Sequence, residues 1–259
     1  MNVVDSDWVA DRLDELRVVD VREGWEYEGI GHLPGAVSVP FDSFRSEGEG
    51  EAGMLPGADA FAALMGEAGI TREDDVLAYD DTHGVFAARF LVTCELYGHP
   101  SDRLHLLDGD YSAWTRETSR EVPEPDATTY EASFVEDGPL VDAETVAAAA
   151  DDPDSVLVDT REEWEFEEGH IPGAVRLDWL ELVDQESRGL KPETDLRALL
   201  DERGVGPEKR VVLYCNTARR ISHTYVVLRH LGYEDLAFYE GSLTEWEAAG
   251  RPLEGADAE

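Results

Sequence analysis

The sequence predicts an α/β fold in which one module occurs twice, each copy being a mainly parallel β-sheet flanked by helices. Two observations lead to this prediction. An internal repeat spans most of the chain, and within each copy short apolar runs alternate with amphipathic segments of helical spacing. We therefore expect two domains, at residues 1–122 and 138–259, with a linker in the acidic, proline-containing stretch 119–139.

The repeat is visible in three pairs of segments that match in the same order: 18–37 with 156–175, 76–80 with 211–215, and 106–114 with 238–246. The first pair shares Asp-x-Arg, Trp-Glu and His-x-Pro-Gly-Ala, with one extra residue before His32. Because matches occur at both ends of a long unit, coincidence does not explain them, and the chain is read as a duplication.

The elements of the second copy follow from its periodicity. The apolar runs VLVDT and VVLYC have the composition of buried parallel strands. The expected strands are 156–160, 211–215 and 236–241, and the expected helices are 193–203 and 222–231. Each of these helices is followed by a glycine, a common helix terminator.

Acidic residues dominate the composition: 59 Asp and Glu stand against 21 Lys and Arg, giving a formal net charge of −38. Such a surface repels phosphate backbones and anionic lipid, so neither nucleic acid nor a membrane is an expected partner. A functional acidic face would cluster the carboxylates, whereas these are spread over both copies. We therefore favour a solvated surface adapted to high salt, and a halophilic source, over an acidic binding face.

The sequence shows no apolar run long enough to span a bilayer and no apolar N-terminal leader. Its two cysteines, Cys94 and Cys215, lie in different copies and indicate no disulfide framework. A reducing cytoplasm suits free thiols, so we expect a cytoplasmic protein. Cys94 falls on the apolar side of a predicted helix and is expected to fill the core.

The candidate chemistry lies where two strands of the second copy end, because ligands of open α/β sheets bind beyond the carboxyl ends of the strands. The loop after Cys215 leads into the helix expected from Ser222, so backbone N–H groups and the helix dipole make it an anion-binding nest. A cysteine in that positive field is expected to have a lowered pKa and to act as a nucleophile. The expected substrate-binding residues are Asn216, Thr217, Ala218, Arg219 and Arg220 of this loop, and Arg161 at the end of the neighbouring strand.

Two residues near this loop keep alternative interpretations. Arg161 recurs as Arg22 in the first copy, which favours a bracing role as much as substrate contact. His223 falls in the first turn of the expected helix, where a core role competes with steadying a thiolate. His32 and His170 hold matching positions in both copies, so we expect them to be structural.

The first copy has Asp80 in the place of Cys215, and its loop from Asp80 to Val85 has no arginine and two carboxylates. We expect neither a nucleophile nor an anion cradle there, so this copy should be catalytically silent.

No cofactor or metal is expected. The sequence has no Walker A motif, no C-x-x-C and no H-E-x-x-H. A G-x-G-x-x-G string at residues 48–53 follows no predicted strand, and its glutamates would repel a pyrophosphate, so we interpret it as a loop.

Asp-x-Arg followed by Glu-x-Gly-His-Ile-Pro-Gly-Ala, a strand ending in Tyr-Cys and a terminal Gly-Ser-x-x-Glu-Trp resemble the tandem-domain rhodaneses, the thiosulfate and 3-mercaptopyruvate sulfurtransferases. The resemblance covers nearly the whole chain and includes an inactive first copy. It implies two rhodanese-like domains and a double displacement through a persulfide on Cys215, with a small-molecule sulfur donor and a thiophilic acceptor such as cyanide or a cellular thiol. It also implies that Arg161 and Arg220 contact the donor anion, Arg219 being less certain.

Alternatives remain open at this point. The loop Cys-Asn-Thr-Ala-Arg-Arg lacks the arginine that often follows the cysteine in thiosulfate enzymes, so 3-mercaptopyruvate is an alternative donor to thiosulfate. A persulfide carrier that serves a protein acceptor in a thiolation or cofactor pathway is a second alternative. A cysteine phosphatase is disfavoured, because its loop needs C-x5-R and this chain has C-x4-R.

Overall fold

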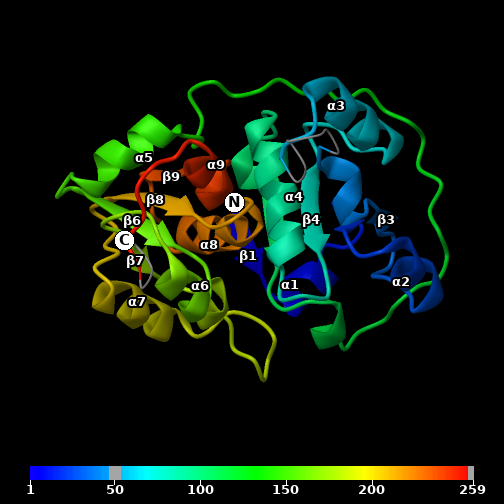
Figure 1. Ribbon diagram of the computed structural model, residues 1–259. Helices are drawn as coiled ribbons and strands as arrows, with labels where there is room; N and C mark the ends of the chain where they lie inside the picture. Colours follow the sequence, from blue (N-terminus) through cyan, green and yellow to red (C-terminus); the bar gives the residue numbers. More distant parts are fainter. Residues whose placement is uncertain (47–53, 256–259) are drawn as a thin grey trace. The chain divides into compact units, whose positions relative to one another are not determined.

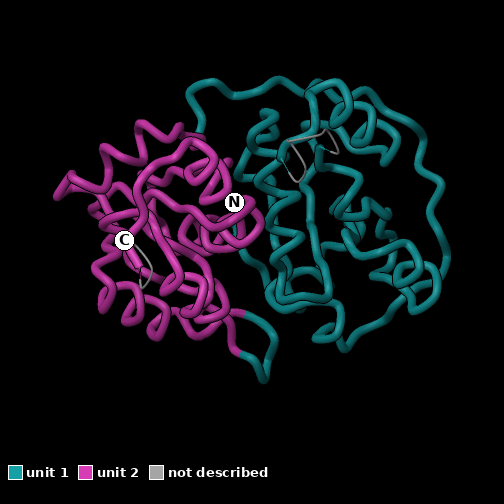
Figure 2. The backbone as a smooth tube through the Cα atoms, in the orientation of Figure 1, with its two compact units in different colours: residues 1–138, 185–189 teal, residues 139–184, 190–259 magenta. Residues whose placement is uncertain are grey.

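The computed structural model describes residues 1–46 and 54–255, so the G-x-G-x-x-G string at 48–53 lies outside the described residues. The chain divides into two compact units (Figure 2). Unit 1 comprises residues 1–138 and 185–189, and unit 2 comprises residues 139–184 and 190–259. Residues 123–137, which the repeat assigns to neither domain, belong to unit 1.

Unit 1 is a parallel sheet with helices packed against it, in the strand order β1-β5-β4-β2-β3. Its strands are β1 (Asn2–Val4), β2 (Leu16–Asp20), β3 (Val37–Ser38), β4 (Asp75–Tyr79) and β5 (Leu104–Leu107). Its α-helices are α1 (Ser6–Ala10), α2 (Gly24–Gly29), α3 (Ala58–Glu67) and α4 (Val85–Leu96), with short 3-10 turns at Phe41–Phe44, Ser101–Arg103 and Tyr111–Ala113. The long helix α4 runs beside β4 (Figure 1) and contacts β4 and β5.

Unit 2 repeats this plan, with the parallel strand order β7-β6-β8-β9. Its strands are β6 (Ser155–Asp159), β7 (Val175–Arg176), β8 (Arg210–Tyr214) and β9 (Leu236–Phe238). Its helices are α5 (Ala143–Ala150), α6 (Glu163–Glu168), α7 (Glu193–Glu202), α8 (Arg219–His230) and α9 (Ser242–Ala248), with a 3-10 turn at Trp179–Leu182. The predicted α/β fold of two parallel modules is thus confirmed.

The central strands are buried because both faces of each sheet are covered by helices, as their apolar sequences require. Cys94 lies fully buried in α4, and burial raises the pKa of its thiol well above the ordinary value. The prediction that Cys94 fills the core is confirmed, and its thiol is held in the unreactive protonated form.

The residues that recur in both copies form the same buried framework. In unit 1 the guanidinium of Arg22 binds the Asp20 carboxylate with N···O distances of 2.5–3.1 Å and donates to the Gly31 carbonyl. His32 stacks on Tyr27, and its Nδ1 lies 3.0 Å from the Leu33 carbonyl oxygen. These contacts hold the turn after β2, which explains why the sequence keeps them.

Unit 2 repeats that framework. His170 stacks on Phe166, and its Nδ1 lies 2.8 Å from the Phe166 carbonyl oxygen. The Tyr214 hydroxyl accepts the Ile171 N–H at 3.0 Å, as Tyr79 accepts the Leu33 N–H in unit 1. The structural interpretation of both histidines is therefore supported by their contacts.

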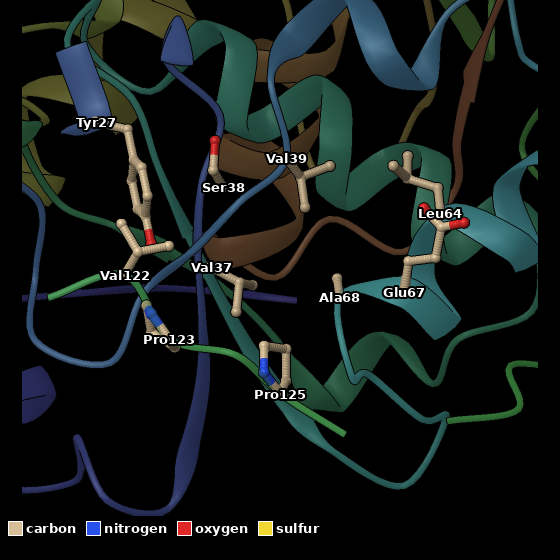
Figure 3. A pocket seen from close by; sticks show the side chains of 10 residues that line it. All are labelled: Tyr27, Val37, Ser38, Val39, Leu64, Glu67, Ala68, Val122, Pro123 and Pro125. Carbon is tan, nitrogen blue, oxygen red and sulfur yellow. The ribbon is translucent and has the colours of Figure 1, made fainter. Parts of the chain in front are cut away.

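The stretch 122–135 packs against the rest of unit 1. Thr128 donates its N–H to the Gly66 carbonyl at 2.9 Å, and Val135 donates to the Leu96 carbonyl at 2.9 Å. A Cβ on Gly66 would lie 2.7 Å from the Thr128 carbonyl oxygen, so this close approach requires glycine. Figure 3 shows Val122, Pro123 and Pro125 lining a cavity of about 250 Å³ together with side chains that include Tyr27 and Val37.

Within the described part of the chain, no helix is both long enough and apolar enough to cross a bilayer.

Candidate active site

The candidate site lies at the carboxyl ends of β6 and β8, which are adjacent parallel strands. Asp159 pairs with Tyr214 in their register, and the Thr160 N–H donates to the Tyr214 carbonyl at 3.0 Å. Cys215 is the next residue along the chain. The two elements that the sequence placed at this edge, 159–161 and 215–220, are therefore brought together.

The backbone of Cys215 is held on both sides by the start of α9. Its N–H donates to Ser242 Oγ at 3.2 Å, and its carbonyl accepts the Leu243 N–H at 2.9 Å. Thr244 Oγ1 donates to the Asn216 carbonyl at 3.0 Å. Ser242 and Thr244 were not predicted as site residues, although the Gly-Ser-x-x-Glu-Trp motif that contains Ser242 recurs as Gly-Asp-x-x-Ala-Trp and so marked this segment. They fix the position of the thiol, whose residue is 1% exposed.

Helix α8 begins at Arg219, three residues before the predicted start at Ser222. Ala218 adopts a left-handed conformation, with φ +58°, and turns the chain directly into the helix. Non-glycine residues seldom adopt this conformation, so an alanine at this position does not predict it. Arg219 and Arg220 are therefore first-turn helical residues, and the prediction that placed them in the loop was wrong.

The loop of unit 2 is one residue shorter than its counterpart in unit 1. Helix α4 begins five positions after Asp80, whereas α8 begins four positions after Cys215. Both helices follow a residue in the left-handed conformation, Gly84 in unit 1 and Ala218 in unit 2. When the two helices are aligned at their first residues, Arg220 corresponds to Phe86. An alignment that starts from Asp80 and Cys215 would instead match Arg220 with Val85.

An anion cradle exists in unit 1, contrary to expectation, and the protein's own Asp80 carboxylate fills it. Oδ1 accepts the N–H groups of Thr82 and Gly84, both at 2.8 Å. Oδ2 accepts those of Phe86 and Ala87, at 2.7 and 3.1 Å. Burial raises the pKa of Asp80, and the four amide donors oppose that shift. From the sequence, Asp80 was expected only to repel an anion. Its hydrogen bonds to the loop amides show that it is itself the bound anion.

Unit 2 has the same succession of elements, a strand end, a short loop, a left-handed residue and a helix start, with Cys215 at the position of Asp80. Counted from the helix start, Ala218, Arg220 and Ile221 hold the positions of the residues that bind Asp80 in unit 1. A cysteine side chain is shorter than aspartate and has no carboxylate to place there. A sulfur-bound anion would extend into the same cradle.

Glu165 of α6 is the functional candidate that sequence reasoning missed. Its Oε1 accepts Arg220 Nη2 and Asn216 Nδ2, both at 2.8 Å, and its Oε2 accepts Arg220 Nη1. Burial is the largest single influence and raises the pKa of Glu165, but the hydrogen bonds from Arg220, the Glu162 N–H and Asn216, together with the charge of Arg220, make the net shift downward. Glu165 recurs as Glu26, and that recurrence made it look like part of the framework.

Arg161 braces the turn after β6 as Arg22 braces its counterpart. Its guanidinium binds the Asp159 carboxylate at 2.6–3.0 Å and donates to the Gly169 carbonyl at 2.7 Å. Only its Nη1 reaches the loop, lying 3.5 Å from Asn216 Oδ1. Arg161 therefore borders the site with one nitrogen while its charge is matched by Asp159.

A cavity of about 540 Å³ opens beside the loop, lined by Arg161, Trp164, Glu165, Glu168, Gly169, Asn216, Leu243, Thr244, Glu247 and Leu253. Thr217 and Arg219 are exposed and are absent from the described lining. His223 is fully buried in α8, and its ring meets Trp179 edge-on at 5.2 Å. In residues 1–46 and 54–255 no group of three His, Cys, Asp or Glu side chains is placed to hold a metal ion.

Comparisons with known proteins match both copies to one family. The rhodanese-like domain model matches residues 5–117 and again residues 142–249. The thiosulfate sulfurtransferase of Azotobacter vinelandii is 34% identical over 90% of this chain and 88% of its own. The sulfur carrier protein TtuD of Thermus thermophilus is 29% identical over 94% of this chain and 93% of its own.

Among solved structures, that of SseA from Escherichia coli, described as having the rhodanese fold of 3-mercaptopyruvate sulfotransferases, superposes with a TM-score of 0.82. It is 24% identical and the match covers 93% of this chain and 98% of that one, which supports the fold.

Proposed function

Because the chain belongs to the rhodanese family, we propose that it is a thiosulfate sulfurtransferase that carries sulfane sulfur as a persulfide on Cys215. The observation that supports this most directly is the contrast between the two loops. One set of backbone amides binds the Asp80 carboxylate in unit 1, and in unit 2 a cysteine stands at the position of Asp80, before a helix that also begins after a left-handed residue. Unit 2 is thus the catalytic copy and unit 1 the silent one.

The reaction is a double displacement. The Cys215 thiolate attacks the outer sulfur of thiosulfate, the sulfur–sulfur bond of the donor breaks, and sulfite leaves with the bonding electron pair. The negative charge of the resulting persulfide is stabilised by the amides of Ala218, Arg220 and Ile221 and by the amino end of α8. A thiophilic acceptor then attacks the outer persulfide sulfur, and the Cys215 thiolate is released.

Donor choice tests this assignment against the first alternative. We expect kcat/KM for thiosulfate to exceed that for 3-mercaptopyruvate by about tenfold, because a compact dianion gains more from amide donors than a monoanionic keto acid. Steady-state assays with cyanide as acceptor, at matched high ionic strength, measure this ratio. A ratio below one would assign the protein to 3-mercaptopyruvate.

A persulfide carrier is the second candidate, and the likeness to TtuD favours it. A carrier would accept sulfur faster from a desulfurase persulfide than from thiosulfate, and would pass it to a protein thiol. Single-turnover loading of Cys215 from each donor separates the two, since an enzyme that uses thiosulfate loads from it within its turnover time.

We also propose that the protein works in a salt-rich, reducing cytoplasm, without nucleic acid or membrane partners. The support is its 59 acidic against 21 basic residues and its two free cysteines. Self-repulsion of this charge is screened as the Debye length falls from about 10 Å at 0.1 M to about 3 Å at 1 M salt.

The melting temperature is therefore expected to rise by about 5 °C or more between 0.1 and 2 M KCl. Scanning calorimetry in a KCl series measures it, with equal osmolality of sucrose as the uncharged control. A flat or falling melting temperature in KCl would contradict adaptation to salt.

A further inference from the structure

We propose that Glu165 sets the charge selectivity of the Cys215 site, by holding Arg220 neutralised so that an incoming anion competes with a built-in carboxylate. This inference rests on the proposed function for its biological meaning, but its physical content concerns only unit 2. It makes Glu165 a specificity-determining residue that acts through Arg220, and not a catalytic one.

The contacts of Glu165 are directed at both ends of the cysteine loop. Its four hydrogen bonds come from Arg220 (two), from Asn216 Nδ2 and from the Glu162 N–H at 3.1 Å. The residue is 7% exposed, so the ion pair is shielded from bulk solvent and salt screens it weakly. A fixed carboxylate at this place opposes anions by a local, salt-resistant field.

Unit 1, which has Asp80 at the position of Cys215, differs from unit 2 in this arrangement. In the part of unit 1 that the structure describes, Glu26 accepts one hydrogen bond, from the Glu23 N–H. Asp81 follows Asp80 as Asn216 follows Cys215, and Phe86 is the second residue of its helix as Arg220 is of α8, so unit 1 has neither the amide nor the guanidinium at these places. Glu26 and Glu165 therefore both cap their helices, and only Glu165 is also seen to bind an arginine in the described residues.

The charges around Cys215 cancel in pairs. Asp159 matches Arg161, and Glu165 matches Arg220. The Cys215 sulfur also acts electrostatically on Arg220. Burial lowers the pKa of Arg220, but Glu165 and the Cys215 thiolate together raise it above the ordinary value. These two ion pairs then add no net charge to attract a dianion, and the backbone amides at the start of α8 gain in importance.

Glu165 also stands at the wall of the access cavity. It lines the cavity of about 540 Å³ with Arg161 and Asn216, whereas Arg220 is absent from the described lining. Two further carboxylates, Glu168 and Glu247, lie along the same wall. The Glu165 carboxylate is therefore exposed to the cavity, where its charge can act on an anion that enters it.

The test compares two alkylating reagents of similar size, anionic iodoacetate and neutral iodoacetamide, at Cys215. Their rate ratio cancels the thiolate fraction and the accessibility of the sulfur, and so reports the local field. We expect Glu165→Gln to raise the iodoacetate-to-iodoacetamide ratio by about tenfold. Peptide mass spectrometry follows Cys215 separately from Cys94.

Matched controls come from the same helix and from the other copy. Glu168→Gln removes an exposed charge from the same cavity wall and is expected to change the ratio less than about twofold. Glu26→Gln makes the equivalent change in unit 1 and should leave it unchanged. Equal changes for Glu165→Gln and Glu168→Gln would overturn the proposal, because they would indicate a diffuse surface effect.

Arg220→Gln keeps the test decisive if Glu165→Gln folds poorly. It leaves the Glu165 charge unopposed, so the ratio should fall below that of the unmodified protein, and the double variant E165Q/R220Q should restore it. If neither Glu165→Gln nor Arg220→Gln changes the iodoacetate-to-iodoacetamide ratio, charge selection by Glu165 is refuted.

Sulfur transfer gives a separate readout. If thiosulfate is the donor, Glu165→Gln should lower its KM by about tenfold while changing the KM for 3-mercaptopyruvate less. A protein that alkylates as expected but transfers no sulfur from either donor would leave this inference standing and refute the proposed function. Unchanged alkylation ratios in an active sulfurtransferase would refute this inference and leave the proposed function standing.

Discussion

Incubation with thiosulfate in the absence of an acceptor will add one sulfur, about 32 Da, to Cys215, because a double displacement leaves a covalent persulfide when no acceptor removes it. On the proposed function the amides at the start of α8 favour this state, because a negative charge beside the first turn of a helix is stabilised. Intact-protein and peptide mass spectrometry measure the adduct, and cyanide should remove it as thiocyanate.

The two cysteines provide the matched comparison. Cys215→Ser should abolish the adduct and reduce kcat/KM by about 10³-fold or more, because a serine hydroxyl is a far weaker nucleophile at neutral pH. Cys94→Ser should leave both unchanged, since Cys94 lies fully buried in α4 of unit 1 and its raised pKa keeps it a thiol. An adduct that persists in Cys215→Ser would refute a persulfide on this residue.

The sequence predicted the parallel sheets, the duplication and the meeting of 159–161 with 215–220. These features follow from periodicity and from strand order, which local sequence reports well. It also marked Asn216 and Arg220, which the structure places together beside the Cys215 backbone.

What the sequence could not show depended on backbone conformation and on pairing across the fold. An alanine in the left-handed conformation shortens the second loop, and no residue-type preference signals this at Ala218. The pairing of Glu165 with Arg220 joins residues far apart in the chain, and the recurrence of Glu165 as Glu26 hid it. A motif shared by two copies can thus carry a framework role in one and an additional role in the other.

The role of Asp80 shows why an inactive copy can retain the geometry of an active one. Four amides that converge on one point are costly to bury without an acceptor, so a loop of this shape must be filled by something. In unit 1 the acceptor is the Asp80 carboxylate of the chain itself, so there the loop contributes to stability. We propose that the corresponding loop of unit 2, where Cys215 replaces Asp80, serves sulfur transfer instead.

Asp80→Ala is accordingly expected to destabilise unit 1 by about 3 kcal/mol, because it leaves four amide donors, two of them in buried hydrogen bonds, without their acceptor. Asp42→Ala is the control: Asp42 makes a solvent-exposed ion pair with Arg45, and its loss should cost less than about 1 kcal/mol. Urea unfolding followed by far-UV circular dichroism measures both.

The cradle itself is tested by refilling it. Sulfate should raise the melting temperature of Asp80→Ala more than it raises that of the unmodified protein, when each is compared with chloride at equal ionic strength, because a small oxyanion can accept the N–H groups that Asp80 releases. If sulfate stabilises both proteins equally, the amides do not form a site that an external anion can occupy. An equivalent set of amides in unit 2 would then not be expected to bind a sulfur-bound anion.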